Sequence, residues 1–448
     1  MKLYPDSKVY IFCPGNVKTG GPESLHQLAS QLISFDVQAY MVYGQLGDNP
    51  FNPKDPVHDA YKKYHVPYLT RLEDTERNVK ILPETVTAEL YTGQNLRRVV
   101  WWMSVNNYLK NIIKIFERFL KTPFVTPMPK FFTFFNEDEN IEHWFKSEYA
   151  RQFLELNGMP ADKLHFVETY MNQAFLSRAA QIDLRAKKNI VAFNPKKGFE
   201  ITQNFIKLMP DVEWRAIDGM TSEQVQELLA SAKVYVDFGE HPGKDRLPRE
   251  AILSGCVVIT GRRGAAANDV DYNIPAEFKF DEYTTKPQQV IDKIHDVFEN
   301  FLEAHAAQKA FREKELNARK NFAAQVADAF EINWSPRPGI AFPQTVSGKI
   351  FLLAKRFSAS KKFSGGFIVD DVVARANISD KLFWREQNRN FLKLGIGFAE
   401  IITRDDAKFL YQEGRIKKFA LTDPTDAELD ALKNFYGARN EDVMIFQL

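Results

Sequence analysis

The chain has 448 residues, 44% of them hydrophobic, and a formal net charge of +1. Such a length and composition are typical of a globular protein with two or more domains, and the near-zero charge argues against a nucleic-acid-binding protein. The two cysteines, Cys13 and Cys256, lie far apart next to apolar segments, which predicts free thiols rather than a disulfide or a thiolate metal site. We find neither an apolar signal segment at the N-terminus nor an apolar run of membrane-spanning length, so the sequence predicts a cytoplasmic protein.

Apolar strands and short loops alternate through the first third of the chain. Strands are predicted at 8–13, 37–43, 79–85 and 97–104. Between the first strand and a helix with an apolar face lies the pair Gly20 and Gly21. Glycines there let backbone amides approach a ligand, although a glycine pair can also simply turn the chain.

Polar side chains follow the strand at 97–104. Ser104, Asn106 and Asn107 supply hydroxyl and amide groups that can hydrogen-bond a polar ligand. The stretch 108–132 that follows mixes basic and apolar residues, and its basic residues are Lys110, Lys114, Arg118, Lys121 and Lys130. Basic amphipathic helices are typical of weak attachment to an anionic membrane surface, and the alternative is a helix whose basic face is only solvated.

The stretch 232–260 predicts a βαβ unit. A strand at 234–238 is followed by a loop at 239–246, a helix beginning near Leu247 and a buried strand at 256–260. Ligands of parallel sheets bind at the carboxyl ends of the strands, where Lys244, Arg246 and Arg249 supply positive charge. The N-terminus of the helix also attracts phosphate. Glu250, one turn into the helix, suits a sugar hydroxyl rather than an anion.

The segment 248–259, with its glutamate, small-residue turn and apolar strand, resembles the donor-site signature of retaining GT-B glycosyltransferases of the family 4 type. Glu250 matches the second glutamate of that signature. At the place of the first stands Pro242, with Glu240 two residues earlier. After the predicted strand at 189–193, Lys197 matches the family's lysine, and Asn194 lies near the place of its arginine.

The resemblance implies an α/β fold of the GT-B kind, with two Rossmann-like domains facing a cleft. We expect an acceptor domain at 1–175, a nucleotide-sugar donor domain at 176–335 and a small appended α+β domain of unknown role at 345–448. By analogy with the family, the strand end at 104–107 borders the acceptor cleft, so Ser104, Asn106 and Asn107 are candidates for orienting a sugar acceptor. The implied enzyme moves a sugar from a nucleotide-sugar to a glycan or lipid-linked acceptor, as in bacterial surface polysaccharide synthesis, with retention of the anomeric configuration. The predicted donor-site residues are Gly20, Gly21, Asn194, Lys197, Glu240, Lys244, Arg246, Arg249 and Glu250, and Lys197, Lys244 and Glu250 are the catalytic candidates among them.

No metal or other cofactor is expected. Asp269 and Asp271 match the Asp-x-Asp pattern of metal-dependent transferases, but no apolar strand precedes them to present the pair. Within residues 345–448, strands are predicted at 350–353, 366–369 and 443–446 and a helix at 423–436, without any chemistry. Two alternatives stay open: a non-catalytic scaffold subunit of similar fold, and an epimerase or inverting transferase, which would need a catalytic base in the first domain.

Overall fold

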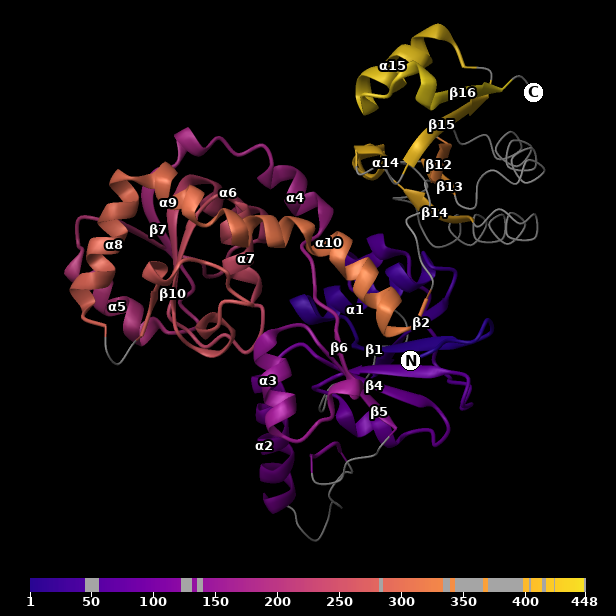
Figure 1. The fold of residues 1–448 in the computed structure, drawn as a ribbon, viewed down its shortest axis with the longest axis horizontal. Coiled ribbons are helices and arrows are strands. Elements are labelled where there is room, and N and C mark those ends of the chain that lie inside the picture. Colours follow the sequence, from indigo (N-terminus) through magenta and orange to yellow (C-terminus); the bar gives the residue numbers. More distant parts are fainter. Residues whose placement is uncertain are drawn as a thin grey trace. The chain divides into compact units, whose positions relative to one another are not determined.

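The computed structural model describes residues 1–44, 56–121, 131–134, 140–281 and 285–332, and shorter stretches between 339 and 446. The described chain divides into two compact units. One comprises Met1–Ala29, Ala39–His58 and Val66–Ile332, and the other comprises Ser30–Gln38, Asp59–His65 and Asn333–Leu448. The first unit holds two sheets and the second holds one (Figure 1).

The first sheet has the strand order β2-β1-β3-β4-β5-β6. Its strands are β1 (Lys8–Pro14), β2 (Gln38–Gly44), β3 (Val79–Pro83), β4 (Arg97–Trp102), β5 (Ile141–Phe145) and β6 (Leu164–Phe166). From β1 to β6 through β3, β4 and β5, every neighbouring pair is parallel. The strands are apolar along their length because both faces of a parallel sheet are covered. Trp101 and Trp102 are fully buried, so both belong to this core and neither can stack on a sugar.

Helices α1 (Gly20–Ile33), α2 (Val105–Lys121) and α3 (Glu148–Leu156) follow β1, β4 and β5. In α1, Leu25, Leu28 and Leu32 are fully buried, as their spacing predicts. The N-terminus of α3 is capped by the Ser147 hydroxyl, which accepts a hydrogen bond from Ala150 N. Each of these helices therefore begins at the carboxyl end of a strand, which places all three N-termini along one edge of the sheet.

The second sheet has the order β11-β10-β9-β7-β8. Its strands are β7 (Lys188–Phe193), β8 (Glu213–Ala216), β9 (Ala232–Asp237), β10 (Val257–Gly261) and β11 (Lys279–Phe280). All described pairs are parallel, and the register Val257↔Val234 confirms the βαβ unit predicted from the sequence. Its helices are α4 (Gln173–Ala179), α5 (Phe199–Leu208), α6 (Ser222–Ser231), α7 (Arg246–Leu253), α8 (Pro287–Glu299), α9 (Phe301–Ala307) and α10 (Lys309–Ala329).

Two parallel sheets with helices confirm the predicted fold of two Rossmann-like domains. In each sheet the order of consecutive strands reverses beside the first strand of that half, β1 in one and β7 in the other. Such a switch point is where parallel α/β sheets bind ligands. Helix α10 packs against both α7 and β6, and so contacts both halves of the first unit.

The third sheet, in the second unit, corrects part of the prediction. Its order is β14-β13-β12-β15-β16, and all its described pairs are parallel, so this part of the chain is α/β rather than α+β. Its elements are β12 (Gly339–Phe342), β13 (Gly366–Val369), β14 (Phe398–Ile402), α14 (Arg404–Gln412), β15 (Ile416–Thr422), α15 (Asp426–Tyr436) and β16 (Val443–Phe446). The predicted strands at 366–369 and 443–446 and the helix ending at Tyr436 are confirmed, whereas 350–353 lies outside the described residues.

Candidate functional site

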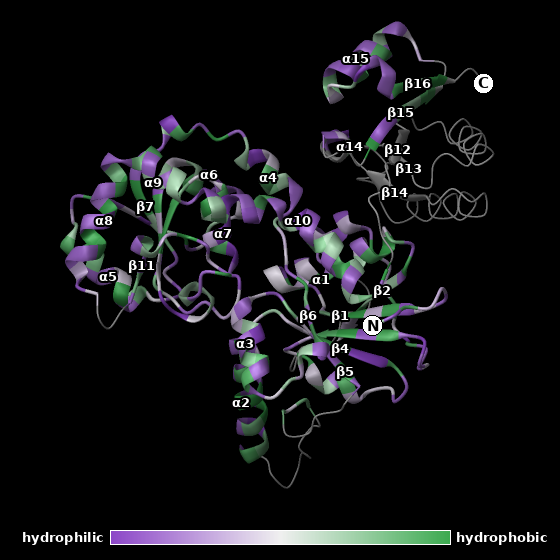
Figure 2. Ribbon diagram, in the orientation of Figure 1, coloured by the Kyte–Doolittle hydropathy of each residue, from purple (hydrophilic) through white to green (hydrophobic). Residues whose placement is uncertain are grey.

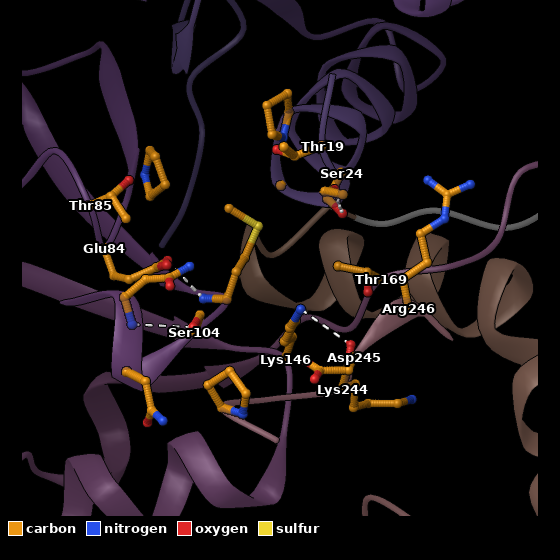
Figure 3. A pocket seen from close by; sticks show the side chains of 18 of the residues that line it. Thr19, Ser24, Glu84, Thr85, Ser104, Lys146, Thr169, Lys244, Asp245 and Arg246 are labelled. Carbon is orange, nitrogen blue, oxygen red and sulfur yellow. Dashed lines mark hydrogen bonds between the residues drawn. The ribbon is translucent and has the colours of Figure 1, made fainter. Parts of the chain in front are cut away.

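A cleft of about 980 Å³ lies within the first unit and is lined by residues of both sheets. From the first sheet, its walls are the segments after β1, β3, β4 and β5; from the second, they are those after β7, β9 and β10. All of these are carboxyl ends of parallel strands, and the switch points of both sheets are among them. Figure 3 shows Glu84 and Ser104 from one sheet across from Asp245 and Arg246 of the other, with Lys146 beside Lys244 and Asp245.

The lining of the cleft is basic. Nine lysines and arginines line it, against five aspartates and glutamates. Helices α1, α5 and α7 each direct an N-terminus at it, through the cleft-lining residues Gly20, Gly198 and Arg246. Because the first N–H groups of a helix lack partners within the helix, these termini favour an anionic ligand.

Glycines allow the loops around the cleft to approach one another. Gly198 has a φ of +61°, and a Cβ there would lie 2.4 Å from the backbone carbon of Phe238. A Cβ at Gly243 would lie 2.7 Å from the carbonyl oxygen of Met103. A larger residue at Gly198 would push the loop after β7 away from the loop after β9, and one at Gly243 would push the loop after β9 away from the end of β4. Gly20 and Gly21 line the cleft without such close neighbours, so packing alone does not explain them.

Lys197 has the exposure expected of an anion ligand. It lies in the loop after β7, lines the cleft and forms an ion pair with Asp245, the residue before α7. Its side chain is about a third exposed, at 36%. The second residue predicted in this loop, Asn194, is not among those that line the cleft, and its side-chain oxygen accepts a hydrogen bond from Lys196 N.

Lys244 and Arg249 line the cleft but direct their charges into a buried network. Lys244 is 2% exposed, and its ammonium lies 2.9 Å from Glu168 Oε2 and 3.0 Å from Glu315 Oε1. Arg249 donates to Glu315 and to the hydroxyl and carbonyl of Thr169. Burial by itself would raise the pKa of Glu315, but the charges of Arg249 and Lys244 outweigh it and lower that pKa to about 2. This geometry favours a structural role for both cations over the predicted contact with a diphosphate.

Arg246 joins the two halves of the cleft. It forms ion pairs with Glu250 on its own helix and with Glu23 in the first turn of α1, the latter at 2.8 Å. Burial raises the pKa of Glu250, and the Arg246 charge opposes that rise. Glu250 is 7% exposed and is not among the residues that line the cleft. Its predicted contact with the donor sugar or ribose stays a prediction.

The three acceptor candidates all line the cleft. Asn106 Nδ2 donates to Glu240 Oε2 at 2.8 Å, which links the start of α2 to the loop after β9. Ser104 Oγ accepts a hydrogen bond from Asn107 N at 3.3 Å. Main-chain contact between the same two segments, from Val105 N to Pro242 O at 3.2 Å, fixes these polar groups relative to the second sheet. Their role toward an acceptor stays a prediction.

Sequence reasoning did not predict several ionisable residues of the cleft, and Glu84 and Lys146 are the two that directly follow strands of the first sheet. Glu84 directly follows β3 and is 2% exposed, and burial raises its pKa to about 7. Lys146 directly follows β5, and burial lowers its pKa to about 8. Both positions are carboxyl ends of apolar strands, and that was the one signal in the sequence that could have identified them.

Asp269 and Asp271 have separate partners. Asp269 pairs with Lys279 at 2.8 Å, and Asp271 accepts hydrogen bonds from the main-chain nitrogens of Glu148 and Tyr149 at the start of α3. Among the described residues, no group of three His, Cys, Asp or Glu side chains could hold a metal ion. A metal-independent reaction remains a prediction.

No protein-family model and no curated protein matches the chain. Several solved structures do. HepE from Anabaena, crystallised with UDP-glucose, is 10% identical, with 72% of this chain and 99% of that chain covered and a TM-score of 0.42. A glycosyltransferase from Rickettsia africae is 13% identical, with 73% and 98% covered and a TM-score of 0.42. Sucrose-phosphate synthase from Thermosynechococcus elongatus is 12% identical, with 79% and 100% covered and a TM-score of 0.44. The chain is similar to these enzymes, but at such TM-scores the similarity assigns neither donor nor acceptor.

Proposed function

We propose that the protein is a glycosyltransferase that moves a sugar from a nucleotide-sugar donor to a hydroxyl-bearing acceptor. The basic cleft at the switch points of two parallel sheets is the observation that carries this proposal. Its volume suits a nucleotide-sugar, and ligand pockets of about 300–1,000 Å³ are usual. The positive lining and the three helix N-termini suit a diphosphate, whose charge grows when the bond to the sugar breaks.

Lys197 is the residue we propose for the diphosphate. Its side chain is 36% exposed, whereas that of Lys244 is 1% exposed, and its ion pair with Asp245 holds it beside the N-terminus of α7. Hydrogen bonds to charged groups contribute roughly 1.5–3 kcal/mol, which is at least about tenfold in affinity. Lys197→Ala should therefore weaken the binding of a nucleoside diphosphate by that factor and leave nucleoside binding almost unchanged.

Calorimetry with UDP, GDP and ADP on the wild type and two variants tests the function. The matched control is Lys207→Ala, which removes an exposed lysine at the end of α5, away from the cleft. Turnover of the corresponding nucleotide-sugars is then followed by release of the diphosphate. If the wild type binds no nucleoside diphosphate, the proposal is wrong. Binding without turnover of any donor would favour the scaffold subunit.

The resemblance to the family 4 type predicts that the anomeric configuration is retained. An inverting transferase is the second candidate, and Glu84 is the observation that favours it, because inversion needs a base on the acceptor side. The configuration of the released sugar, read by NMR before mutarotation, separates the two candidates.

We also propose that α2 attaches the enzyme to an anionic membrane surface, where a lipid-linked acceptor of surface polysaccharide synthesis would lie. Leu109, Ile113, Phe116 and Leu120 are between 42% and 71% exposed along α2. Their basic neighbours Lys110, Lys114 and Lys121 are exposed as well, and Figure 2 shows hydrophobic and hydrophilic residues alternating along this helix. Exposed apolar and basic groups together are typical of interfacial helices. Residues 122–130 of the predicted segment lie outside the described part, and no described helix is both long and apolar enough to cross a bilayer.

A further inference from the structure

One carboxylate at the switch point of the first sheet has no role in the donor site described above. Glu84 follows β3, and Met103 follows the neighbouring strand β4, where Pro83 pairs with Trp101. Glu84 Oε2 accepts a hydrogen bond from Met103 N at 3.0 Å. The side chain is 2% exposed and still contributes to the lining of the cleft. A nearly buried carboxylate that faces a cleft has a high cost of desolvation, which is common at sites of proton transfer.

Lys146 lies on the same wall of the cleft. It follows β5, which pairs with β4 on the side away from β3. Its Nζ lies 3.4 Å from the carbonyl oxygen of Lys244, on the loop after β9, and its Cε lies 3.1 Å from the position of a Cβ at Gly243. Glu84 and Lys146 interact electrostatically, and the charged groups around Lys146 are Asp245, Arg249 and Lys244. Figure 3 shows Glu84 beside the acceptor candidate Ser104, and Lys146 nearer to Lys244 and Asp245 of the donor loop.

We propose that Glu84 is the general base that takes the proton from the acceptor hydroxyl, and that Lys146, at the end of the strand beyond β4, is a positioning residue for it. This inference rests on the proposed function in its second form, the inverting transferase, because direct attack by a deprotonated acceptor hydroxyl inverts the anomeric carbon. In the step, the hydroxyl oxygen of an alcohol, a sugar hydroxyl in the natural case, forms a bond to the anomeric carbon. Its proton passes to the Glu84 carboxylate. The bond from the anomeric carbon to the diphosphate breaks, and its electron pair leaves on the nucleoside diphosphate.

The ionisation of the two groups agrees with this role. Burial raises the pKa of Glu84 to about 7, while the positive charge of Lys146 and main-chain N–H groups oppose the rise. A base of this strength can accept a proton near neutral pH and release it again. Burial lowers the pKa of Lys146 to about 8, so its charge is present where Glu84 must ionise. A carboxylate that only fixed the turn after β4 would need no access to the cleft.

Glu84→Gln separates the two roles, because the amide oxygen can still accept the hydrogen bond from Met103 N. The probes are the sugar-nucleotide forms of the diphosphate that binds, with water or glycerol as the acceptor. We expect unchanged affinity for the nucleoside diphosphate, a loss of turnover of about 10²–10⁴-fold and an inverted product from the wild type. Glu76→Gln, an exposed glutamate before β3, should behave like the wild type.

Lys146 has a test of its own. Removing its positive charge should raise the pKa of Glu84. When turnover is plotted against pH, the acid limb of the curve for Lys146→Gln should therefore lie at higher pH than that of the wild type. Lys146→Arg should restore its position. A structural role for Lys146 would lower the rate without moving that limb.

Three outcomes would overturn the inference: Glu84→Gln that keeps more than about a third of the wild-type turnover, a product of retained configuration, or an acid limb that does not move in Lys146→Gln. Failure of the wild type to bind any nucleoside diphosphate, in contrast, would refute the proposed function itself. The binding and turnover measurements therefore distinguish the two failures.

Discussion

The buried charge network under the cleft makes the sharpest stability prediction. Glu315 on α10 is 1% exposed and contacts both Lys244 and Arg249. Replacing it by glutamine leaves two buried cations short of a counter-charge. Removing one partner of a buried ion pair costs about 3–5 kcal/mol. The depressed pKa gives an independent figure: a shift from 4.5 to about 2 corresponds to a contribution on the order of 3 kcal/mol near neutral pH.

The stabilising contribution of Glu315 depends on pH in a defined direction. Because the pKa of Glu315 is lower in the folded protein than in the unfolded chain, its contribution is present above about pH 4.5 and is lost as the pH falls toward 2. We expect Glu315→Gln to lower the urea midpoint strongly at pH 7 and much less at pH 3, measured by tryptophan fluorescence. Glu313→Gln on the same helix is the control, since its exposed pair with Lys309 contributes about 0–1 kcal/mol. Equal shifts for the two variants, or a Glu315 effect that is independent of pH, would refute the reasoning.

Two further predictions concern the activity and the membrane. Turnover should persist in EDTA and be unaffected by Asp269→Ala, because we expect basic side chains rather than a metal ion to face the diphosphate; complete loss that added manganese or magnesium restores would contradict this. Wild-type protein should co-sediment with anionic liposomes in a salt-sensitive way, and a variant with Lys110, Lys114, Arg118 and Lys121 changed to Gln should bind less, since each basic residue contributes about 1 kcal/mol at most. Equal sedimentation of the two proteins would assign α2 to a solvated surface.

The sequence was sufficient to predict the structural units that depend on the order of neighbouring segments. Apolar runs of strand length followed by glycine loops and helices indicate parallel βαβ units, and the unit at 232–260 has that structure. Because parallel strands place their carboxyl ends at one edge, Gly20, Ser104, Lys197 and Arg246 could be assigned to a single cleft, and all four line it.

Pairing between distant residues could not be predicted. Lys244 and Glu168 are 76 residues apart, and nothing around Lys244 indicates that its charge is neutralised. Glu84 belongs to no motif: its place after an apolar strand was visible in the sequence, but its burial was not. The third sheet was assigned to the wrong class because the strands at 398–402 and 416–422 were not recognised, so its parallel order had no visible signal.

The last prediction concerns the ion pair between Glu23 and Arg246, which a diphosphate bound to Arg246 would have to break. Arg246 is predicted to bind the diphosphate, yet Glu23 Oε2 already lies 2.8 Å from its Nη1. The Glu23 side chain is 11% exposed and that of Arg246 is 38% exposed, so their pair is partly screened by water and contributes about 1 kcal/mol. A diphosphate that binds Arg246 competes with this carboxylate.

Glu23→Gln should therefore bind the nucleoside diphosphate several-fold more tightly than the wild type, because about 1 kcal/mol corresponds to roughly fivefold. Glu200→Gln is the matched control: it removes the same charge from another cleft-lining glutamate, one on α5 that has no ion pair with Arg246 among the described residues. Calorimetry at two salt concentrations completes the comparison, since a long-range effect of charge alone would be equal in both variants and would fade in salt. Equal tightening of both, or none in Glu23→Gln, would mean that Arg246 does not contact the diphosphate, which would leave Lys197 as its main cation.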